Sequence, residues 1–435
     1  MKIVSTYKVK IRKTHGAFKN TVEQYRLAVD FFISVVLAEW EYLSQISSSL
    51  DQQRAVEILT HRTSNNPSPK YDFAKDFYKF PSYLRRAAII EAIGKVSSYK
   101  SNYTNWEKNP KGQEPGEPKA GKIYPAMYRK NCFVRTGTNT AELKVYINRT
   151  WDWLDIELKN TDVKYIQKHC KNRKECVPTL QRRGKNWYLD FAFEEEVKIE
   201  KKEINQQIIL GVDLGINNDC VCSAMKSDGT VIGRKFLDLS REKDCLNHAI
   251  NRVKKAQQHG AKRTPRLWAR AKGINTHIAN LTAQFIVETA ISYKADVVVF
   301  EHLDLKGKKR RKKKHKLHLW KSRAVQKIVA CKMHRLGKRI SHICAWGTSR
   351  LAYDGSGEVE RDEKNYSMCV FKTGKKYHCD LSASYNIGAR YFIREILKSL
   401  AVTLRLDMEA KVPSCTKRTT CTLATLINLN TGLAA

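Results

Sequence analysis

The chain is short of acidic residues. Its 435 residues hold 80 Lys and Arg against 43 Asp and Glu, which leaves a formal net charge of +37. No stretch approaches the ~20 apolar residues of a membrane-spanning helix, so no membrane partner is expected. The first residues turn polar too early for a signal peptide. The 12 Cys lack a disulfide-like framework, so we expect a reducing cytoplasm.

Other function classes are disfavoured in the same way. The chain has no Gly-x-x-x-x-Gly-Lys-Ser/Thr loop, so an ATP-driven motor is not indicated. The hydrophobic fraction of 42% is enough for packed cores and excludes global disorder. The length suggests two to four domains. Lys and Arg occur throughout residues 1–400, and such a surplus points to a polyanion, with nucleic acid as the leading candidate.

The first 205 residues combine strand and helix patterns. Alternation of apolar and basic residues at 7–13 predicts a half-buried strand. Apolar residues at helical spacing predict helices through 20–40 and 81–106, and a linker rich in Pro and Gly follows at 108–121. Further short strands are predicted at 143–147, 153–158 and 187–193. The first strand and this later set would form one β-domain with a helical insertion.

After residue 206 the pattern is typical of an α/β domain. The apolar runs 208–213 and 296–300 predict strands that are buried on both faces. A basic, helix-prone stretch covers 240–272, and a periodic helix follows through Phe285. Alternating buried strands and helices indicate the α/β class. Residues 401–435 show no clear periodicity.

Three carboxylates stand at the ends of these elements. Asp213 follows an apolar strand and precedes a Gly-containing turn, Glu301 follows the second strand, and Asp380 opens an apparent helix. A turn or a helix cap accounts for each acid taken alone. Together in one α/β domain, they predict a metal constellation.

Phosphodiester hydrolysis is a reaction that would use such a group of carboxylates. Carboxylates alone would repel the phosphate, so they serve by holding hard cations such as Mg²⁺ or Mn²⁺. Two such ions clamp the attacking and leaving oxygens of an in-line displacement. We therefore expect two ions, with Asp213 bridging them and with Glu301 and Asp380 each completing one site.

The motifs around these acids resemble a known family. The order GVDLGINN, VVFEHLDL and CDLSASYNIGAR is similar to the split RuvC nuclease domain of transposon-encoded TnpB proteins and compact type V CRISPR effectors. The resemblance is specific over about 207–395 and weaker over 1–205. It implies a multidomain α/β protein with an RNase H-like (RuvC) nuclease domain in the C-terminal half. In the N-terminal half it implies a wedge β-barrel with an inserted α-helical recognition lobe.

The resemblance also implies domain limits. The expected limits are 1–15 and 120–205 for the wedge barrel, 16–119 for the recognition lobe, 206–345 and 380–400 for the nuclease domain, 346–379 for a target-nucleic-acid-binding insert, and 401–435 for a C-terminal tail.

The implied activity is RNA-guided, Mg²⁺-dependent DNA cleavage in the bacterial cytoplasm, in association with the nucleoid. The partners would be a structured guide RNA and a double-stranded DNA target, of which the protein reads only a short flanking motif. Two alternatives remain open. One is an unguided resolvase-type or RNase H-like nuclease with the same three acids, and the other is a guided binder or repressor with little cleavage. Oligomeric state is not predicted.

The insert departs from the family pattern. Members usually carry two Cys-x-x-Cys pairs there, but Ala352 and Gly355 stand at the first pair and only Cys369 remains near the second. Cys344, Cys369, His378 and Cys379 could be combined into four ligands, but they lack the usual zinc-site spacing. We therefore expect no zinc and an insert that is held by hydrophobic packing.

A run of nine Lys or Arg in eleven residues spans 306–316 and begins five residues after Glu301. Like charges keep such a run extended when it is free. Its position beside the expected active site predicts contacts to nucleic-acid phosphates. The expected contact residues are Lys308, Lys309, Arg310, Arg311, Lys312, Lys313 and Lys314.

Overall fold

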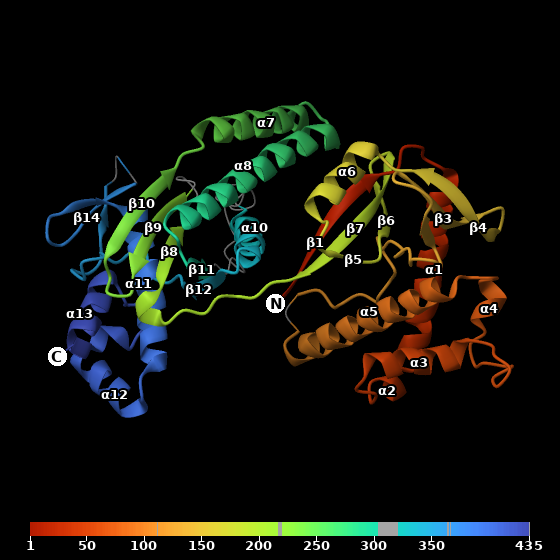
Figure 1. The fold of residues 1–435 in the computed structure, drawn as a ribbon, viewed down its shortest axis with the longest axis horizontal. Coiled ribbons are helices and arrows are strands. Elements are labelled where there is room, and N and C mark those ends of the chain that lie inside the picture. The colour runs from red at the N-terminus through yellow and green to blue at the C-terminus, as the bar shows by residue number, and fades with distance from the viewer. Residues whose placement is uncertain (111, 216–219, 303–320, 363–364, 366, 435) are drawn as a thin grey trace. The chain divides into compact units, whose positions relative to one another are not determined.

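A computed structural model of the protein describes residues 1–110, 112–215, 220–302, 321–362, 365 and 367–434. The chain divides into two compact units, which we call the N-terminal unit (Lys2–Glu196) and the C-terminal unit (Val197–Ala435, with Met1) (Figure 1). No helix in the described part of the chain is both long and apolar enough to cross a bilayer.

The strands of the N-terminal unit form two antiparallel sheets. One sheet has the order β1-β7-β5, with β6 also paired to β7, and the other has the order β2-β3-β4. The expected strand near the start of the chain and the strand predicted at 187–193 are neighbours, because β1 pairs with β7 from Lys2 with Glu196 to Lys10 with Tyr188. The strands are β1 (Lys2–Lys10), β2 (Phe133–Arg135), β3 (Thr140–Ile147), β4 (Thr150–Glu157), β5 (Lys174–Glu175), β6 (Thr179–Arg183) and β7 (Asn186–Glu196).

The helices of this unit share one hydrophobic core with the sheets. Phe32 of α1, Leu84 of α5 and Phe191 of β7 are all buried in the same cluster. The hydroxyl of Thr21 in α1 accepts a hydrogen bond from the amide of Tyr146 in β3 at 2.8 Å. The helices are α1 (Gly16–Ala38), α2 (Trp40–Leu43), α3 (Ser49–Thr60), α4 (Phe73–Asp76), α5 (Ser82–Lys108) and α6 (Asn160–His169).

The β-barrel expected for this unit is not seen. The two sheets meet at isolated contacts such as the bridge between Ile11 and Leu158, and the described residues form no closed barrel. The physical reason is that α1 and α5 contribute their apolar faces to the same core, so helices cover a surface that further strands would otherwise have to close.

The C-terminal unit is built on a five-stranded sheet in the order β10-β9-β8-β11-β12. Strand β11 runs parallel to both β8 and β12, whereas β9 is antiparallel to β8 and β10. The two buried strands expected from their apolar runs are therefore direct neighbours. The strands are β8 (Ile208–Asp213), β9 (Cys220–Lys226), β10 (Val231–Leu237), β11 (Val297–His302) and β12 (Arg339–Cys344).

Helices cover both faces of this sheet (Figure 1). Alternate residues of β8 and β11 enter different cores: Ile209 packs with α11, whereas Leu210 and Val298 pack with α8 and α10. This is why the strands read as continuous apolar runs, since each is buried on both sides. The expected α/β class is confirmed. The helices are α7 (Ser240–Gln258), α8 (Pro265–Ser292), α10 (Ser322–Arg335) and α11 (Cys379–Ser399), with the short turn η1 (Ile204–Gln206) before β8.

The last residues of the chain are folded, although their sequence lacks a clear period. Helix α12 (Val402–Lys411), the turn η2 (Pro413–Cys415) and helix α13 (Leu423–Ala434) follow α11. Leu426 and Leu429 of α13 are fully buried in the same cluster as Ile387 and Phe392 of α11. Residues 401–434 thus complete the core on one side of the five-stranded sheet.

The segment expected to replace a zinc ribbon is a small sheet with its own apolar cluster. Strands β13 (Glu360–Arg361), β14 (Met368–Val370) and β15 (Lys376–His378) pair in that order. Ala352, Cys369, Phe371 and Cys379 are all buried in one cluster, so hydrophobic packing holds the insert as expected. Burial raises the pKa of Cys369 to about 12, which keeps it a thiol at neutral pH.

Helix α11 approaches β8 through two glycines. A Cβ on Gly211 would lie 2.5 Å from the carbonyl oxygen of Ser384 and 3.1 Å from the amide nitrogen of Gly388. A Cβ on Gly388 would lie 3.0 Å from Ile209. Because Gly211 and Gly388 have no side chains, the helix can approach the strand this closely.

Replacing Gly211 with alanine should destabilise the C-terminal unit by about 1–3 kcal/mol, because the new methyl group meets backbone rather than a movable side chain. Urea unfolding of the full chain measures this. The matched control is Gly273→Ala in α8, where a Cβ meets nothing within 4 Å. We expect that control to be neutral or stabilising by about 0.5–1 kcal/mol. Equal stabilities for the two variants would contradict the close approach.

Candidate active site

Two of the expected acids lie at the same edge of the sheet. Asp213 is the last residue of β8, and Glu301 lies near the end of β11. The register pairs Val212 with Phe300, so the next residues along these parallel strands are Asp213 and Glu301. The carboxyl ends of parallel strands are the usual place for ligand sites in α/β sheets.

The third acid arrives on a helix. Asp380 is the second residue of α11 and lies in its first turn. The close packing of Gly211 against Gly388 holds this helix on β8. The charges of both Glu301 and Asp380 act on Asp213, so the structure brings the three acids to one locality.

The electrostatics of Asp213 reflect this crowding. Its side chain is only 8% exposed. Burial raises its pKa well above the usual value, and the neighbouring carboxylates of Glu301 and Asp380 raise it further. A buried carboxylate beside two others is costly to ionise, and a bound cation would remove that cost.

The donor chemistry of the three acids thus suits a hard divalent cation. Their side chains do not form a closed coordination shell, however. Across the described ranges, no three His, Cys, Asp or Glu side chains are arranged so that they could hold a metal ion together. The three acids therefore lie close together, but their side chains are not arranged as a complete set of metal ligands.

Glu301 is held by a residue whose role the sequence did not indicate. The buried hydroxyl of Thr348 donates a hydrogen bond to the Glu301 carboxylate and lies 3.1 Å from the carbonyl oxygen of Ala345. Burial raises the pKa of Glu301, while the hydrogen bond from Thr348 and the charge of Arg390 oppose that rise. The amide of Gln326 also donates to the Glu301 main-chain carbonyl at 3.1 Å.

Replacing Thr348 with valine tests this contact, because valine keeps the shape and removes the donor. We expect the pKa of Glu301 to rise further and the stability to fall by about 1–2 kcal/mol. Carbon-detected NMR titration of the Glu301 carboxyl group reports the pKa, and thermal unfolding reports the stability. Thr348→Ser, which keeps the hydroxyl, is the matched control and should leave the pKa of Glu301 in place.

Two further residues of α11 fix the segment that carries Thr348. The side-chain amide of Asn386 donates to the carbonyls of Thr348 at 3.1 Å and Leu351 at 2.9 Å, and its oxygen accepts from the amide of Leu423 at 3.2 Å. Both Asn386 and Arg390 are buried. Both lie within the motif CDLSASYNIGAR, but only the structure shows which groups they bind.

Arg390 makes four hydrogen bonds to main-chain carbonyls. Its guanidinium group donates to Cys344 at 2.8 Å and Trp346 at 2.7 Å, both near the end of β12. It also donates to Thr419 at 2.9 Å and Cys421 at 3.0 Å in the C-terminal segment. One buried cation therefore ties α11 to two loops beside the carboxylates.

The remaining expected contact residues are not described. Lys308 through Lys314 lie outside the described residues, so their contacts to nucleic acid stay a prediction. Of the four candidate zinc ligands, Cys369 and Cys379 are buried in one apolar cluster, where the thiol of Cys369 donates to the main-chain carbonyl of Tyr377 at 3.3 Å. Cys344 lies on β12, opposite His302, and belongs to a different part of the unit.

The fold and the acids together define an α/β domain with carboxylates at adjacent strand ends, and known proteins resemble it. A structure described as the Cas12f1-sgRNA-target DNA complex is similar over 78% of this chain and 73% of that chain, with a TM-score of 0.50 and 14% identity. At that identity the likeness concerns the fold alone: the chain has a mixed α/β, multi-sheet fold similar to that of a type V Cas12 protein. CasPhi-2 (Cas12j) bound to crRNA and phosphorothioate DNA covers 89% of this chain and 91% of its own, with a TM-score of 0.47 and 10% identity.

The sequence comparisons concern the N-terminal part. Residues 5–147 match the Aq_aa04 family. The uncharacterized protein aq_aa04 of Aquifex aeolicus (strain VF5) is 27% identical over 150 residues, which are 32% of this chain and 83% of that protein. This similarity assigns no activity.

Proposed function

We propose that the protein is an RNA-guided DNA endonuclease that hydrolyses phosphodiester bonds with Asp213, Glu301 and Asp380 as ligands of two Mg²⁺ ions. The observation that carries the proposal is the charge of Glu301 and Asp380 acting on buried Asp213, in a chain whose fold is similar to that of Cas12f1. That protein was solved with a guide RNA and a target DNA. The net charge of +37 suits a partner of that kind.

The residues at the site would have different roles. Asp213 would supply a carboxylate from the floor of the site, Glu301 one from the neighbouring strand, and Asp380 one from the helix above. Thr348 holds Glu301 in place, and Arg390 and Asn386 hold the backbone around Thr348. When bound, the divalent ions supply charge stabilisation and activate water at a phosphodiester.

An exposed aromatic side chain stands near this site. Trp346 is 69% exposed, while its main-chain carbonyl is fixed by Arg390. Indole rings stack on unpaired bases whatever their sequence. Because Trp346 precedes Thr348 by two residues, it is suited to orient a single DNA strand beside the carboxylates.

A second candidate function is guided DNA binding without cleavage. The observation in its favour is that the described carboxylates are gathered but not arranged as a metal-ion cluster. In this case the protein would still hold an RNA and find a matched DNA, but it would leave the phosphodiester bonds intact.

One experiment separates these candidates and an unguided nuclease. The full chain is purified from its native host, and any bound RNA is sequenced end to end. The complex is then incubated with Mg²⁺ and plasmids that carry a match to the variable RNA segment beside randomised flanking DNA. Cleavage of the matched plasmid alone supports the proposal, and matched binding without cleavage supports the second candidate. Absence of a discrete RNA together with equal cleavage of unmatched plasmid would overturn guiding.

A further inference from the structure

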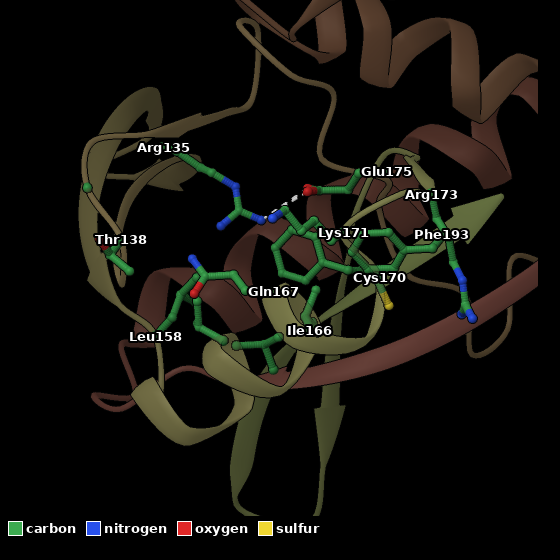
Figure 2. Close-up of a pocket in the computed structure, with 14 residues that line it drawn as sticks. Arg135, Thr138, Leu158, Ile166, Gln167, Cys170, Lys171, Arg173, Glu175 and Phe193 are labelled. Atoms are coloured by element: carbon green, nitrogen blue, oxygen red, sulfur yellow. Dashed lines mark hydrogen bonds and ion pairs between the residues drawn. The ribbon is translucent and has the colours of Figure 1, made fainter. Parts of the chain in front are cut away.

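The N-terminal unit contains a pocket that the proposed function does not use. Its volume is about 510 Å³, within the range of roughly 300–1,000 Å³ that small-molecule sites occupy. The lining comes from β1, β2, β5, β7 and α6, from residues that follow β2 and β4, and from the residues between α6 and β5. Figure 2 shows these segments converging on one hollow.

The floor of the pocket is apolar and partly aromatic. Phe191 and Phe193 of β7 and Ile166 and Cys170 at the end of α6 line it, and all four are buried. Such a floor favours a flat, weakly polar group over a strongly hydrated one. The ligand therefore has an apolar or aromatic part.

The rim of the pocket carries a positive charge. Arg135, Lys171 and Arg173 line it with one acid, Glu175, and Arg173 is paired at 2.9 Å with Glu195, so the charge available to a ligand comes from Lys171 and Arg135. Glu175 is already shared by two arginines, since it lies 3.1 Å from Arg135 and 2.8 Å from Arg129. Lys171 is exposed and has no ion-pair partner among the described residues. The ligand therefore also has an anionic part.

The guanidinium group of Arg135, at the rim of the pocket, packs against the ring of Phe191. The guanidinium carbon of Arg135 lies 5.0 Å from the centre of the Phe191 ring. Guanidinium groups held in this way are common platforms for unstacked bases, and they also bind phosphate. Figure 2 shows the Arg135 side chain reaching over the apolar floor toward Glu175.

Two polar side chains at the mouth lack partners. Gln167 of α6 and Thr138 line the pocket, are exposed, and make no hydrogen bond to any described residue. A carboxamide offers one donor and one acceptor side by side, which matches the edge of a nucleobase. The side chains at the opening of the pocket can therefore form hydrogen bonds with the polar edge of a nucleobase.

We infer that this pocket binds a single unstacked nucleotide, with its base on the apolar floor near Gln167 and its phosphate at Lys171 and Arg135. An aromatic body, a polar edge and an anionic group are the three features that the lining selects for, and a nucleotide combines them. The nucleotide is either one residue of a bound RNA or a free nucleoside monophosphate. The inference does not depend on cleavage, because the three carboxylates belong to the other unit.

The test uses the full chain and two variants of exposed residues, which should fold normally. Gln167→Trp fills the mouth, and Lys171→Ala removes the charge that has no partner. The control is Lys168→Ala, because Lys168 is an exposed lysine of α6 that does not line the pocket. The probes are the four nucleoside 5′-monophosphates, measured by calorimetry, and a short single-stranded RNA with and without one abasic position, measured by fluorescence anisotropy.

We expect Lys171→Ala to weaken binding about tenfold and Gln167→Trp to weaken it at least as much, with Lys168→Ala unchanged within about twofold. Binding of the monophosphates identifies a free nucleotide as the ligand. Binding of the RNA alone, weakened by the abasic position, identifies a residue of RNA. Equal losses in Lys171→Ala and Lys168→Ala, or no effect of Gln167→Trp on any probe, would overturn the inference.

Discussion

Replacement of Asp213 by asparagine should abolish DNA cleavage, by at least about 10³-fold, while RNA binding is retained. The amide keeps the shape of the side chain but removes the negative charge that a divalent cation needs. Asp213 is the most deeply placed of the three acids, so no solvent-exposed group can replace it. A matched-plasmid cleavage assay and RNA retention on a filter measure the two outcomes. Undiminished cleavage would refute the assignment.

The same substitution should raise stability when no divalent cation is present. The pKa of Asp213 is raised in the folded state above its unfolded value of about 3.9. Between these two values the folded chain holds a proton that the unfolded chain has released, so stability falls as pH rises above about 4. Asparagine does not titrate. In the presence of a chelator, Asp213→Asn should therefore melt above the parent at pH 7, and the difference should shrink toward pH 4.

Two comparisons make this test specific. Added Mg²⁺ should raise the melting temperature of the parent more than that of Asp213→Asn, because binding to the folded state alone stabilises it. Asp407→Asn is the control for charge, since Asp407 is exposed on α12. That variant should leave both the pH dependence and the response to Mg²⁺ unchanged. Equal Mg²⁺ stabilisation of the parent and Asp213→Asn would show that the cation binds elsewhere.

Arg390→Met should have the largest effect on stability, a loss of about 3–5 kcal/mol. Methionine fills similar space but cannot donate, so the carbonyls of Cys344, Trp346, Thr419 and Cys421 lose the donor they share. Buried polar groups left without partners are costly. Because those carbonyls belong to the loops beside Thr348, cleavage should fall as well, even though Arg390 is a positioning residue.

Urea unfolding of the full chain measures the loss for Arg390→Met. Arg405→Met is the matched control, because Arg405 is exposed on α12 and pairs with Glu409 one turn away. A surface pair of that kind contributes about 0.3–0.5 kcal/mol. Arg390→Lys keeps the positive charge but has fewer hydrogen-bond donors, which point in different directions. Its loss of stability should lie between those of Arg390→Met and Arg405→Met. A loss for Arg390→Met as small as that of the control would contradict the structural role given to this cation.

The local patterns of the sequence predicted much of the C-terminal sheet. The runs that became β8 and β11 were recognisable because only strands covered on both faces are continuously apolar. Asp213 and Glu301 were recognisable because a charged residue directly after such a run is unusual and requires a reason. That the two strands are neighbours could not be read from either run, since pairing depends on surfaces far apart in the chain.

For other parts of the site, the local sequence did not indicate which groups the side chains contact. Thr348, Asn386 and Arg390 are residue types that occur at ordinary positions, and their importance lies in partners 29 to 47 residues away. The expected barrel shows the opposite error. The strands were foreseen, but the described residues form no closed barrel, because period alone does not say which apolar faces share a core with which strands.

By itself, the sequence predicted the α/β class of the second half, pointed to a polyanionic partner and singled out three acids as candidate metal ligands, because period, net charge and residue type are local or additive properties. The tertiary structure decided that β1 pairs with β7, that residues 401–434 pack on α11, and that Gly211 and Gly388 bring Asp380 close to Asp213. These outcomes depend on the fit between distant surfaces. That fit is a property of the packed molecule, and no single segment contains it.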